Sequence, residues 1–249
     1  MCGRFSLEVG WEELFAYFNM VRPAVPPTQM PPRYNIAPTQ PIVVVANADR
    51  GGETRREGQL VRWGFVPAWM KDPKEFTLLV NARSETAAEK PSFRTAMRHR
   101  RVLIPASGFY EWQRFGKGQK SQAYWVRPKD GGVMAFAGLM ETWSDANGSE
   151  IDTACILTTQ ANASFSAIHH RLPVIVHPHS FDRWLDVRGS EPREVADLLA
   201  PVDDQYLEPI PVGDAVNKVS NSGPEIQTRV KEVRSANQKP ENDDQLSMF

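Results

Sequence analysis

The chain has 249 residues and a mass of 28.1 kDa, enough for one large domain or two small ones. Its composition is ordinary for a globular protein, with 41% hydrophobic and 24% charged residues, and its apolar runs are far shorter than a membrane span. Two cysteines, Cys2 and Cys155, can form neither a disulfide framework nor a structural zinc site. Composition therefore argues against membrane, secreted and zinc-finger proteins. We expect a protein of the reducing cytoplasm that needs no metal or cofactor.

The ratio of arginine to lysine is more informative about nucleic-acid binding than the net charge. A formal net charge of −1 argues against a strongly basic nucleic-acid-binding domain. The chain nevertheless holds 20 arginines and only 9 lysines. Arginine is the better residue for bidentate contacts with phosphate, but a GC-rich genome produces the same bias. Composition alone leaves both interpretations open.

The first predicted element is an amphipathic helix, because Trp11, Leu14, Phe15 and Phe18 recur at helical spacing. A proline-rich loop is expected over residues 23–32. Short β-branched or apolar runs with Gly, Pro or Asp at their ends then predict strands. These runs are residues 41–46, 101–104, 124–126, 133–139, 154–159 and 173–176.

Turn residues and helix caps complete the expected elements. Asp130-Gly131-Gly132 predicts a hairpin turn between two of the strands, and Asn147-Gly148 predicts another. A short capped helix is expected behind Ser180, and a second helix from Ser190 to Val202. Many strands, few helices and no regular βαβ alternation indicate an α+β fold with a mainly antiparallel sheet.

The chain shows no internal repeat and no interior linker, so a single domain over residues 1–234 is predicted. From about Ser235 the sequence becomes polar and acidic, and we expect residues 235–249 to be a disordered tail. This tail ends on three apolar side chains, those of Leu246, Met248 and Phe249.

Cys2 is the first candidate for chemistry. Removal of Met1 would leave a free α-amino group beside the Cys2 thiol, with pKa values of about 8 and about 8.5. Such an aminothiol reacts with an aldehyde in two steps: the amine forms a Schiff base, and the thiol then closes a five-membered thiazolidine ring. The alternative is that a cysteine at a frayed terminus has no role.

Three further polar groups stand beside apolar runs. The stretch from Asn81 to Thr86 follows apolar residues, as a site or a turn cap would. Glu111 lies among three aromatic residues, which makes it either a general acid or base or an outward-facing residue of an alternating strand. His169 and His170 precede Arg171 and offer a proton shuttle or a phosphate contact, although a histidine is more often structural. No phosphate-binding glycine loop, helical zinc motif or nucleophile elbow is present.

Each signal is weak alone, but their order along the chain is informative. Seven blocks occur in sequence: MCGRF (1–5), RYNIAPTQ (33–40), WGFVPAW (63–69), NARSET (81–86), GFYEW (108–112), IHHRLP (168–173) and VN (216–217). Together they resemble the SOS-response-associated peptidase (SRAP) family, whose members shield abasic sites in single-stranded DNA. The resemblance extends from residue 2 to about residue 226.

The resemblance implies a single α+β domain of SRAP type, with a barrel-like, mainly antiparallel β core, flanking helices and a positively charged groove. It implies that Cys2, after Met1 removal, forms a thiazolidine crosslink with the ring-opened aldehyde of an abasic deoxyribose. Asn81 would hydrogen-bond the linked sugar, and Glu111 would handle protons beside the ring. His169, rather than His170, would be the acid or base for Schiff-base formation and reversal.

The resemblance also implies contacts with DNA. Arg4, Arg83 and Arg171 match positions that bind backbone phosphates. Four further residues match parts that line the DNA groove: Asn35, Pro38, Trp69 and Met70. Some relatives carry a second aromatic residue at the position of Met70, so base stacking there is weakened or lost.

The chain end carries a separate resemblance. Gln245, Leu246, Ser247, Met248 and Phe249 resemble the short peptide that docks on the bacterial sliding clamp. The apolar side chains would enter a hydrophobic pocket, and Gln245 would hydrogen-bond at its edge. The alternative is a chance pentapeptide.

The expected function is therefore abasic-site processing by a monomeric, cytoplasmic protein of lyase or autopeptidase type, with single-stranded DNA as its partner. Three alternatives stay open. An N-terminal-nucleophile glutamine amidotransferase also begins Met-Cys-Gly, but its glutamine-binding motifs and synthase domain are missing from this sequence. The others are a cysteine peptidase that cleaves other proteins and a non-covalent module that binds single-stranded DNA.

Overall fold

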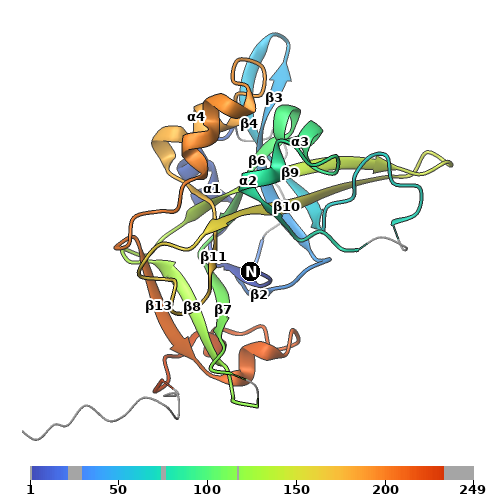
Figure 1. The fold of residues 1–249 in the computed structure, drawn as a ribbon. Helices are drawn as coiled ribbons and strands as arrows, with labels where there is room; N and C mark the ends of the chain where they lie inside the picture. The colour runs from blue at the N-terminus through green and yellow to red at the C-terminus, as the bar shows by residue number, and fades with distance from the viewer. Residues whose placement is uncertain (1, 22–29, 74–76, 117, 233–249) are drawn as a thin grey trace, which may run out of the picture.

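The computed structural model describes residues 2–21, 30–73, 77–116 and 118–232, and these form two β-sheets with short helices around them (Figure 1). One sheet has five strands in the order β13-β8-β7-β1-β2. The other has eight strands, with the path β11-β10-β4-β3-β6-β9-β12 and with β5 paired to β10. All pairings between these strands are antiparallel except those of β10 with β4 and with β5.

The strand bounds locate the chain in each sheet. The five-stranded sheet contains β1 (Phe5–Leu7), β2 (Arg33–Ile36), β7 (Gly108–Gln113), β8 (Gln122–Pro128) and β13 (Leu207–Val212). The eight-stranded sheet contains β3 (Pro41–Arg50), β4 (Glu53–Trp63), β5 (Asn81–Arg83), β6 (Arg101–Ala106), β9 (Met134–Ser144), β10 (Glu150–Gln160), β11 (Arg171–Pro173) and β12 (Ile175–Val176).

Helices in the described ranges are short. The α-helices are α1 (Trp11–Phe18), α2 (Ser84–Ala87), α3 (Arg94–His99) and α4 (Phe181–Leu185). The 3₁₀ helices are η2 (Pro178–Ser180), η3 (Pro192–Leu199), η4 (Asp214–Asn217) and η5 (Pro224–Gln227). None of these helices is long and apolar enough to cross a membrane.

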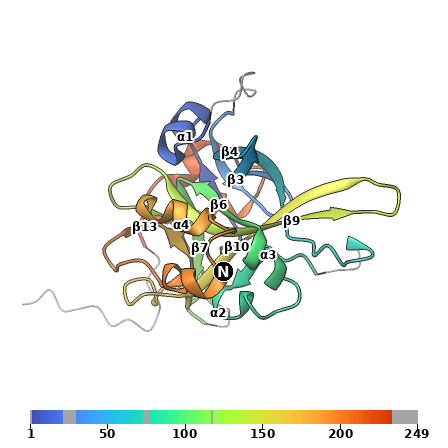
Figure 2. The same cartoon turned by 90° about the horizontal axis from the view of Figure 1, so that it is seen from above.

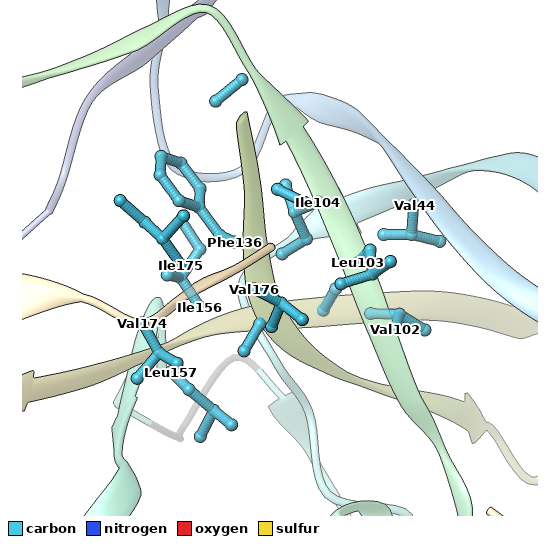
Figure 3. Close-up of a cluster of buried hydrophobic side chains, with 14 of the residues drawn as sticks. Val44, Val102, Leu103, Ile104, Phe136, Ile156, Leu157, Val174, Ile175 and Val176 are labelled. Atoms are coloured by element: carbon cyan, nitrogen blue, oxygen red, sulfur yellow. The ribbon is translucent and has the colours of Figure 1, made fainter. Parts of the chain in front are cut away.

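The main core lies on the eight-stranded sheet. Figure 3 shows side chains from β3, β6, β9, β10 and the segment 174–176 meeting there. Strand β6 is buried along its whole length because helices α3 and α4 contact it, which is why residues 101–106 form a nearly continuous apolar run. A second, smaller apolar cluster surrounds Tyr110 and Trp125 on the five-stranded sheet.

The α+β prediction is confirmed, with a mainly antiparallel core and flanking helices. Helix α1 begins and ends where the apolar spacing of residues 11–18 placed it. The six predicted strands are present, and 173–176 is divided between β11 and β12. The Asn147-Gly148 turn joins β9 and β10 as an antiparallel hairpin, and that hairpin projects from the body of the molecule (Figures 1 and 2).

The hairpin predicted at Asp130-Gly131-Gly132 is wrong. Strand β8 pairs with β7 and β13, whereas β9 pairs with β6, β10 and β12 in the other sheet. A tight turn is present at residues 128–131, where the Gly131 N–H donates to the Pro128 carbonyl oxygen at 2.9 Å, and Gly131 and Gly132 have left-handed φ angles of 76° and 80°. That turn passes the chain from one sheet to the other, because the strands on its two sides have partners far away in sequence.

The predicted helix over residues 190–202 is also different. It is the 3₁₀ helix η3, and its capping box is formed by Glu191 and Glu194 rather than by Ser190. Ser180 occupies the N-cap position of α4 but makes no capping hydrogen bond through its side chain. Six strands lie outside the predicted runs: β1, β2, β4, β5, β7 and β13. Strand β4 is rich in charged residues on a largely exposed hairpin, and β13 contains Pro209 and Pro211. An edge strand tolerates proline because it needs fewer N–H donors.

Candidate active site

The position of β1 brings the chain start to the middle of the fold. Strand β1 lies between β2 and β7 rather than at an edge of the five-stranded sheet. The Tyr110 N–H donates to the Arg4 carbonyl at 2.9 Å and so extends this pairing toward Cys2. Cys2 is only 1% exposed and belongs to the main core. Its position is therefore fixed and is not that of a frayed terminus.

The Cys2 thiol is held in its neutral form. Burial raises its pKa well above the usual range, and the negative charge of Glu111 raises it further. The Sγ atom lies 3.8 Å from the Arg4 carbonyl oxygen, which accepts its weak S–H hydrogen bond. The resting group is a thiol, so its proton must move to a base before or during any reaction at sulfur.

Asn81 reaches Cys2 from the other sheet. Strand β5 runs parallel to β10, with Asn81 opposite Ile156. The Asn81 Nδ2 donates a hydrogen bond of 2.8 Å to the Cys2 carbonyl oxygen. The Asn81 Oδ1 is buried and has no hydrogen-bond partner within the described residues. A buried acceptor without a donor is costly, so this atom is suited to a ligand hydroxyl or N–H.

Glu111 lies on β7 and is 5% exposed, which rules out the outward-facing position considered from the sequence. Its Oε1 accepts the Trp112 N–H at 3.2 Å. It is close enough to Cys2 and to His169 for its charge to raise the pKa of both groups. The structure therefore brings a carboxylate, a thiol and an imidazole together, although they are far apart in sequence.

Gly108 explains how β7 fits this arrangement. A Cβ atom at this position would lie 2.2 Å from the Trp125 Nε1. The Trp125 indole occupies that space and donates to the Ser6 Oγ at 3.2 Å, so it bridges β8 and β1 across β7. The glycine thus permits the close packing that aligns β7, and with it Glu111, beside the N-terminal strand.

His169 is half-buried, while His170 is exposed and stacks on it with ring centroids 4.3 Å apart. Burial lowers the pKa of His169, and Glu111 partly opposes this shift. The His169 Nδ1 lies 3.0 Å from the Arg171 N–H and 3.2 Å from the Arg171 carbonyl oxygen. The N–H contact is shorter and fits the neutral ring that burial favours. We therefore assign Nδ1 as the acceptor of the Arg171 N–H and place the ring proton on Nε2.

The Arg171 side chain, for which the resemblance implies a phosphate contact, is buried. Its side chain is 7% exposed and forms a two-pronged ion pair with Glu85, with N–O distances of 2.5 and 2.9 Å. The same guanidinium donates to the Thr158 carbonyl oxygen, while its Nε is buried and has no hydrogen-bond partner among the residues that the structure describes. Glu85 did not stand out in the sequence, because a single acidic residue near a strand end carries no pattern. Its role as the partner of Arg171 is visible only in the fold.

Asn35 is likewise turned inward. Its side-chain amide donates to the carbonyl oxygens of Lys218 and Asn221, at 3.1 and 2.8 Å, and accepts from Arg4 at 2.7 Å. Arg4 also donates to the Val216 carbonyl oxygen at 2.9 Å. These bonds attach the segment around η4 to β2, so Asn35 and Arg4 organise that segment.

The other expected DNA contacts lie nearer the surface. Arg83 is exposed at the end of β5, and Pro38 is half-buried in the loop before β3. Trp69 is 58% exposed, and its loop is fixed by the Trp143 Nε1, which donates to the Met70 carbonyl oxygen at 2.6 Å. The chain-end residues 245–249 lie outside the described part of the chain.

A buried cysteine next to the chain start, with an amide, a carboxylate and an imidazole around it, is the candidate site of this fold. The comparisons with known proteins show the family. The model of the family "SOS response associated peptidase (SRAP)" matches residues 1–219, and the chain belongs to this family.

Individual relatives cover nearly the whole chain. Abasic site processing protein YoqW of Bacillus subtilis is 37% identical, over 91% of this chain and 98% of its own. Abasic site processing protein YedK of Escherichia coli K12 is 29% identical over the same shares of the two chains. A crystal structure of a protein from Bacteroides thetaiotaomicron superposes with a TM-score of 0.78 at 25% identity, covering 92% of this chain and all of that one. The fold is therefore that of SRAP proteins.

Proposed function

We propose that this protein captures abasic sites in single-stranded DNA by forming a thiazolidine crosslink through Cys2 after removal of Met1. The observation that carries the proposal is the meeting of Asn81, Glu111 and His169 around Cys2. The names of the relatives from Bacillus subtilis and Escherichia coli, both abasic site processing proteins, support the same substrate.

The proposed reaction has two steps at Cys2. Its α-amine adds to the C1′ aldehyde of the ring-opened sugar, and loss of water gives a Schiff base. The sulfur then adds to the Schiff-base carbon while the thiol proton is transferred to nitrogen, which closes the ring with no other leaving group. The net change is aldehyde plus aminothiol to thiazolidine plus water, and no oxidant or cofactor is needed.

Proton transfer is the part of this reaction that the neighbouring side chains serve. Because the Cys2 thiol stays protonated at neutral pH, a nearby base must take its proton as the C–S bond forms. Glu111 is assigned to this step, since its charge acts directly on the thiol. His169 is assigned to the addition and loss of water, because the Nε2 N–H of its neutral ring can donate a hydrogen bond to the aldehyde oxygen and to the hydroxyl that leaves as water.

Substrate positioning is assigned to other groups. The unpartnered Oδ1 of Asn81 is suited to accept a hydrogen bond from the hydroxyl that ring opening frees on the sugar. Exposed Arg83 is assigned to a backbone phosphate and exposed Trp69 to base stacking. Arg4 and Asn35 are assigned to holding the segment around η4 rather than to direct contact with DNA.

A single incubation tests the proposal. Protein whose intact mass shows that Met1 has been removed is mixed with a single-stranded oligonucleotide carrying one uracil that uracil glycosylase has excised. An adduct that survives denaturation supports crosslinking, and the unexcised oligonucleotide is the control. Binding without an adduct would favour a non-covalent module. Cleavage of added proteins without an adduct would favour a peptidase.

For the chain end, we propose docking on the bacterial sliding clamp. The support is the sequence of residues 245–249 alone, with its three apolar side chains at the end of an acidic segment. Tethering would raise the concentration of the domain at replication forks. Titration of a fluorescent peptide of residues 235–249 with sliding clamp should saturate. Binding that persists when Leu246 and Phe249 are both changed to alanine would contradict the proposal.

A further inference from the structure

The ion pair between Glu85 and Arg171 joins three elements beside His169. Glu85 lies on α2, directly after β5, and Arg171 begins β11. Between them runs β10, which pairs with β5 at Thr158 and with β11 at Gln160. The Arg171 guanidinium bonds both to Glu85 and to Thr158. The ion pair therefore connects α2 to β11 across β10, at the edge of the eight-stranded sheet.

The terminal nitrogens of the Arg171 side chain form hydrogen bonds within the fold. Four hydrogen bonds run from its two terminal nitrogens to Glu85 and Thr158, and its Nε is buried. Three of the five N–H donors of the guanidinium are thereby used inside the fold, and they tie the Arg171 side chain to α2 and β10.

The main chain of Arg171 has a different task. Its N–H donates to the His169 Nδ1 at 3.0 Å, which keeps the proton of the neutral ring on Nε2. Tautomer and ring orientation in a histidine are commonly set by the hydrogen bond at the nitrogen that does not react. Any movement of the start of β11 would lengthen this bond and leave the tautomer undefined.

We propose that Glu85 is a positioning residue for the reaction at Cys2, and that it acts by clamping Arg171 so that the Arg171 main chain orients His169. The inference rests on the proposed function for its kinetic consequence, but the orientation of His169 is a property of the DNA-free protein. Glu85 itself need not contact the substrate.

The test uses Glu85→Gln, which keeps the size of the side chain and removes its charge. Glu57→Gln is the matched control, because Glu57 also pairs with an arginine through two hydrogen bonds, on the β3–β4 hairpin. Three quantities are measured on the full chain. They are the ¹⁵N shifts of the His169 ring without DNA, the single-turnover crosslinking rate at saturating abasic oligonucleotide, and the Kd for undamaged single-stranded DNA.

With Glu85→Gln we expect the His169 nitrogens to show a mixture of tautomers and the crosslinking rate to fall about tenfold, as when an orienting partner of a histidine is lost. The Kd for undamaged DNA should stay within about twofold, because the lost contact is not with phosphate. Glu57→Gln should match the wild type in all three. If Glu85→Gln unfolds, Arg171→Lys replaces it, since lysine keeps the charge but not the two-pronged pair.

Two results would overturn the inference. In the first, His169 shifts and crosslinking rate match the wild type. In the second, Glu85→Gln binds undamaged DNA more tightly and with a steeper salt dependence, which would make Arg171 a phosphate ligand that Glu85 masks. If the wild type itself forms no adduct, the proposed function fails, and the His169 shifts still decide whether Glu85 orients the ring.

Discussion

The side-chain amide of Asn81 donates a hydrogen bond of 2.8 Å to the main-chain carbonyl oxygen of Cys2. The two residues belong to different parts of the fold, since Asn81 begins β5 of the eight-stranded sheet and Cys2 precedes β1 of the five-stranded sheet. This bond therefore holds the chain start against the other sheet before any substrate arrives. The second polar atom of the same amide, Oδ1, has no hydrogen-bond partner within the described ranges, so under the proposed function it is the acceptor offered to the substrate.

Asn81→Asp should separate these two tasks. The carboxylate keeps an acceptor toward the substrate but can no longer donate to the Cys2 carbonyl oxygen. Leaving that partly buried carbonyl without its donor should cost about 1–3 kcal/mol of unfolding free energy. Urea unfolding measures this cost, and single-turnover crosslinking should slow in parallel. Unchanged stability would mean that the bond does not hold Cys2 in place.

Cys2→Ala should abolish covalent capture and weaken non-covalent DNA binding only slightly, because no thiol remains to close the ring. Cys2→Ser should give at most a labile Schiff base that is lost on denaturation, since a hydroxyl closes the corresponding ring poorly. Denaturing gels and intact mass record both. A stable adduct formed by Cys2→Ala would assign the linkage to another residue.

Glu111→Gln should have opposite effects on two reactions of the same thiol. Removing a positioned base should slow crosslinking by about 10²–10⁴-fold. The negative charge of Glu111 raises the pKa of the Cys2 thiol, so its removal lowers that pKa and should speed alkylation by iodoacetamide. Cys155 is the internal control, because its pKa is raised by burial and no effect of Glu111 acts on it. Mass spectrometry of the DNA-free protein follows both thiols. Equal slowing of both reactions would indicate a disturbed structure instead.

The pH dependence should follow His169. Its pKa is lowered from 6.5 by burial, so the folded protein keeps the ring neutral at pH values where the unfolded chain would already protonate it. Protonation at Nδ1 breaks the Arg171 N–H bond that orients the ring, so His169 should add a fall in the crosslinking rate below pH 6.5. This fall lies at lower pH than the one caused by protonation of the Cys2 α-amine, whose pKa is about 8. The contribution of His169 to stability should also be lost as pH drops below 6.5. His169→Ala should remove this acid limb and slow the reaction, whereas His170→Ala should retain it. The reverse outcome would move the role to His170.

Arg83→Ala should weaken DNA binding, whereas Asn35→Ala should destabilise the fold. Arg83 is exposed, so its loss should weaken binding to any single-stranded sequence and reduce the salt slope by about one, with little change in stability. Asn35 is buried under the segment around η4, so its loss should lower the unfolding free energy by about 1–3 kcal/mol. Fluorescence anisotropy at several salt concentrations and thermal unfolding distinguish the two. Weaker DNA binding by Asn35→Ala without destabilisation would indicate that Asn35 contacts DNA directly.

Local sequence was sufficient where an element is specified by its own periodicity. Helix α1 follows from the spacing of Leu14, Phe15 and Phe18, and β6 from an unbroken apolar run. The candidate residues Cys2, Asn81, Glu111 and His169 were also found from the chain, because unusual residue types stand beside apolar runs in an order that one family shares.

The directions in which side chains point could be determined only from the folded structure. Nothing near Arg171 in the chain indicates that its guanidinium turns inward to Glu85, which lies 86 residues earlier, or that Asn35 binds carbonyl groups 183 and 186 residues later. The turn at Gly131 was recognisable, but the sheet that each neighbouring strand joins was not. Periodicity and turn chemistry act over a few residues, whereas strand pairing and the pairing of buried charges are settled by partners that only the folded chain brings together.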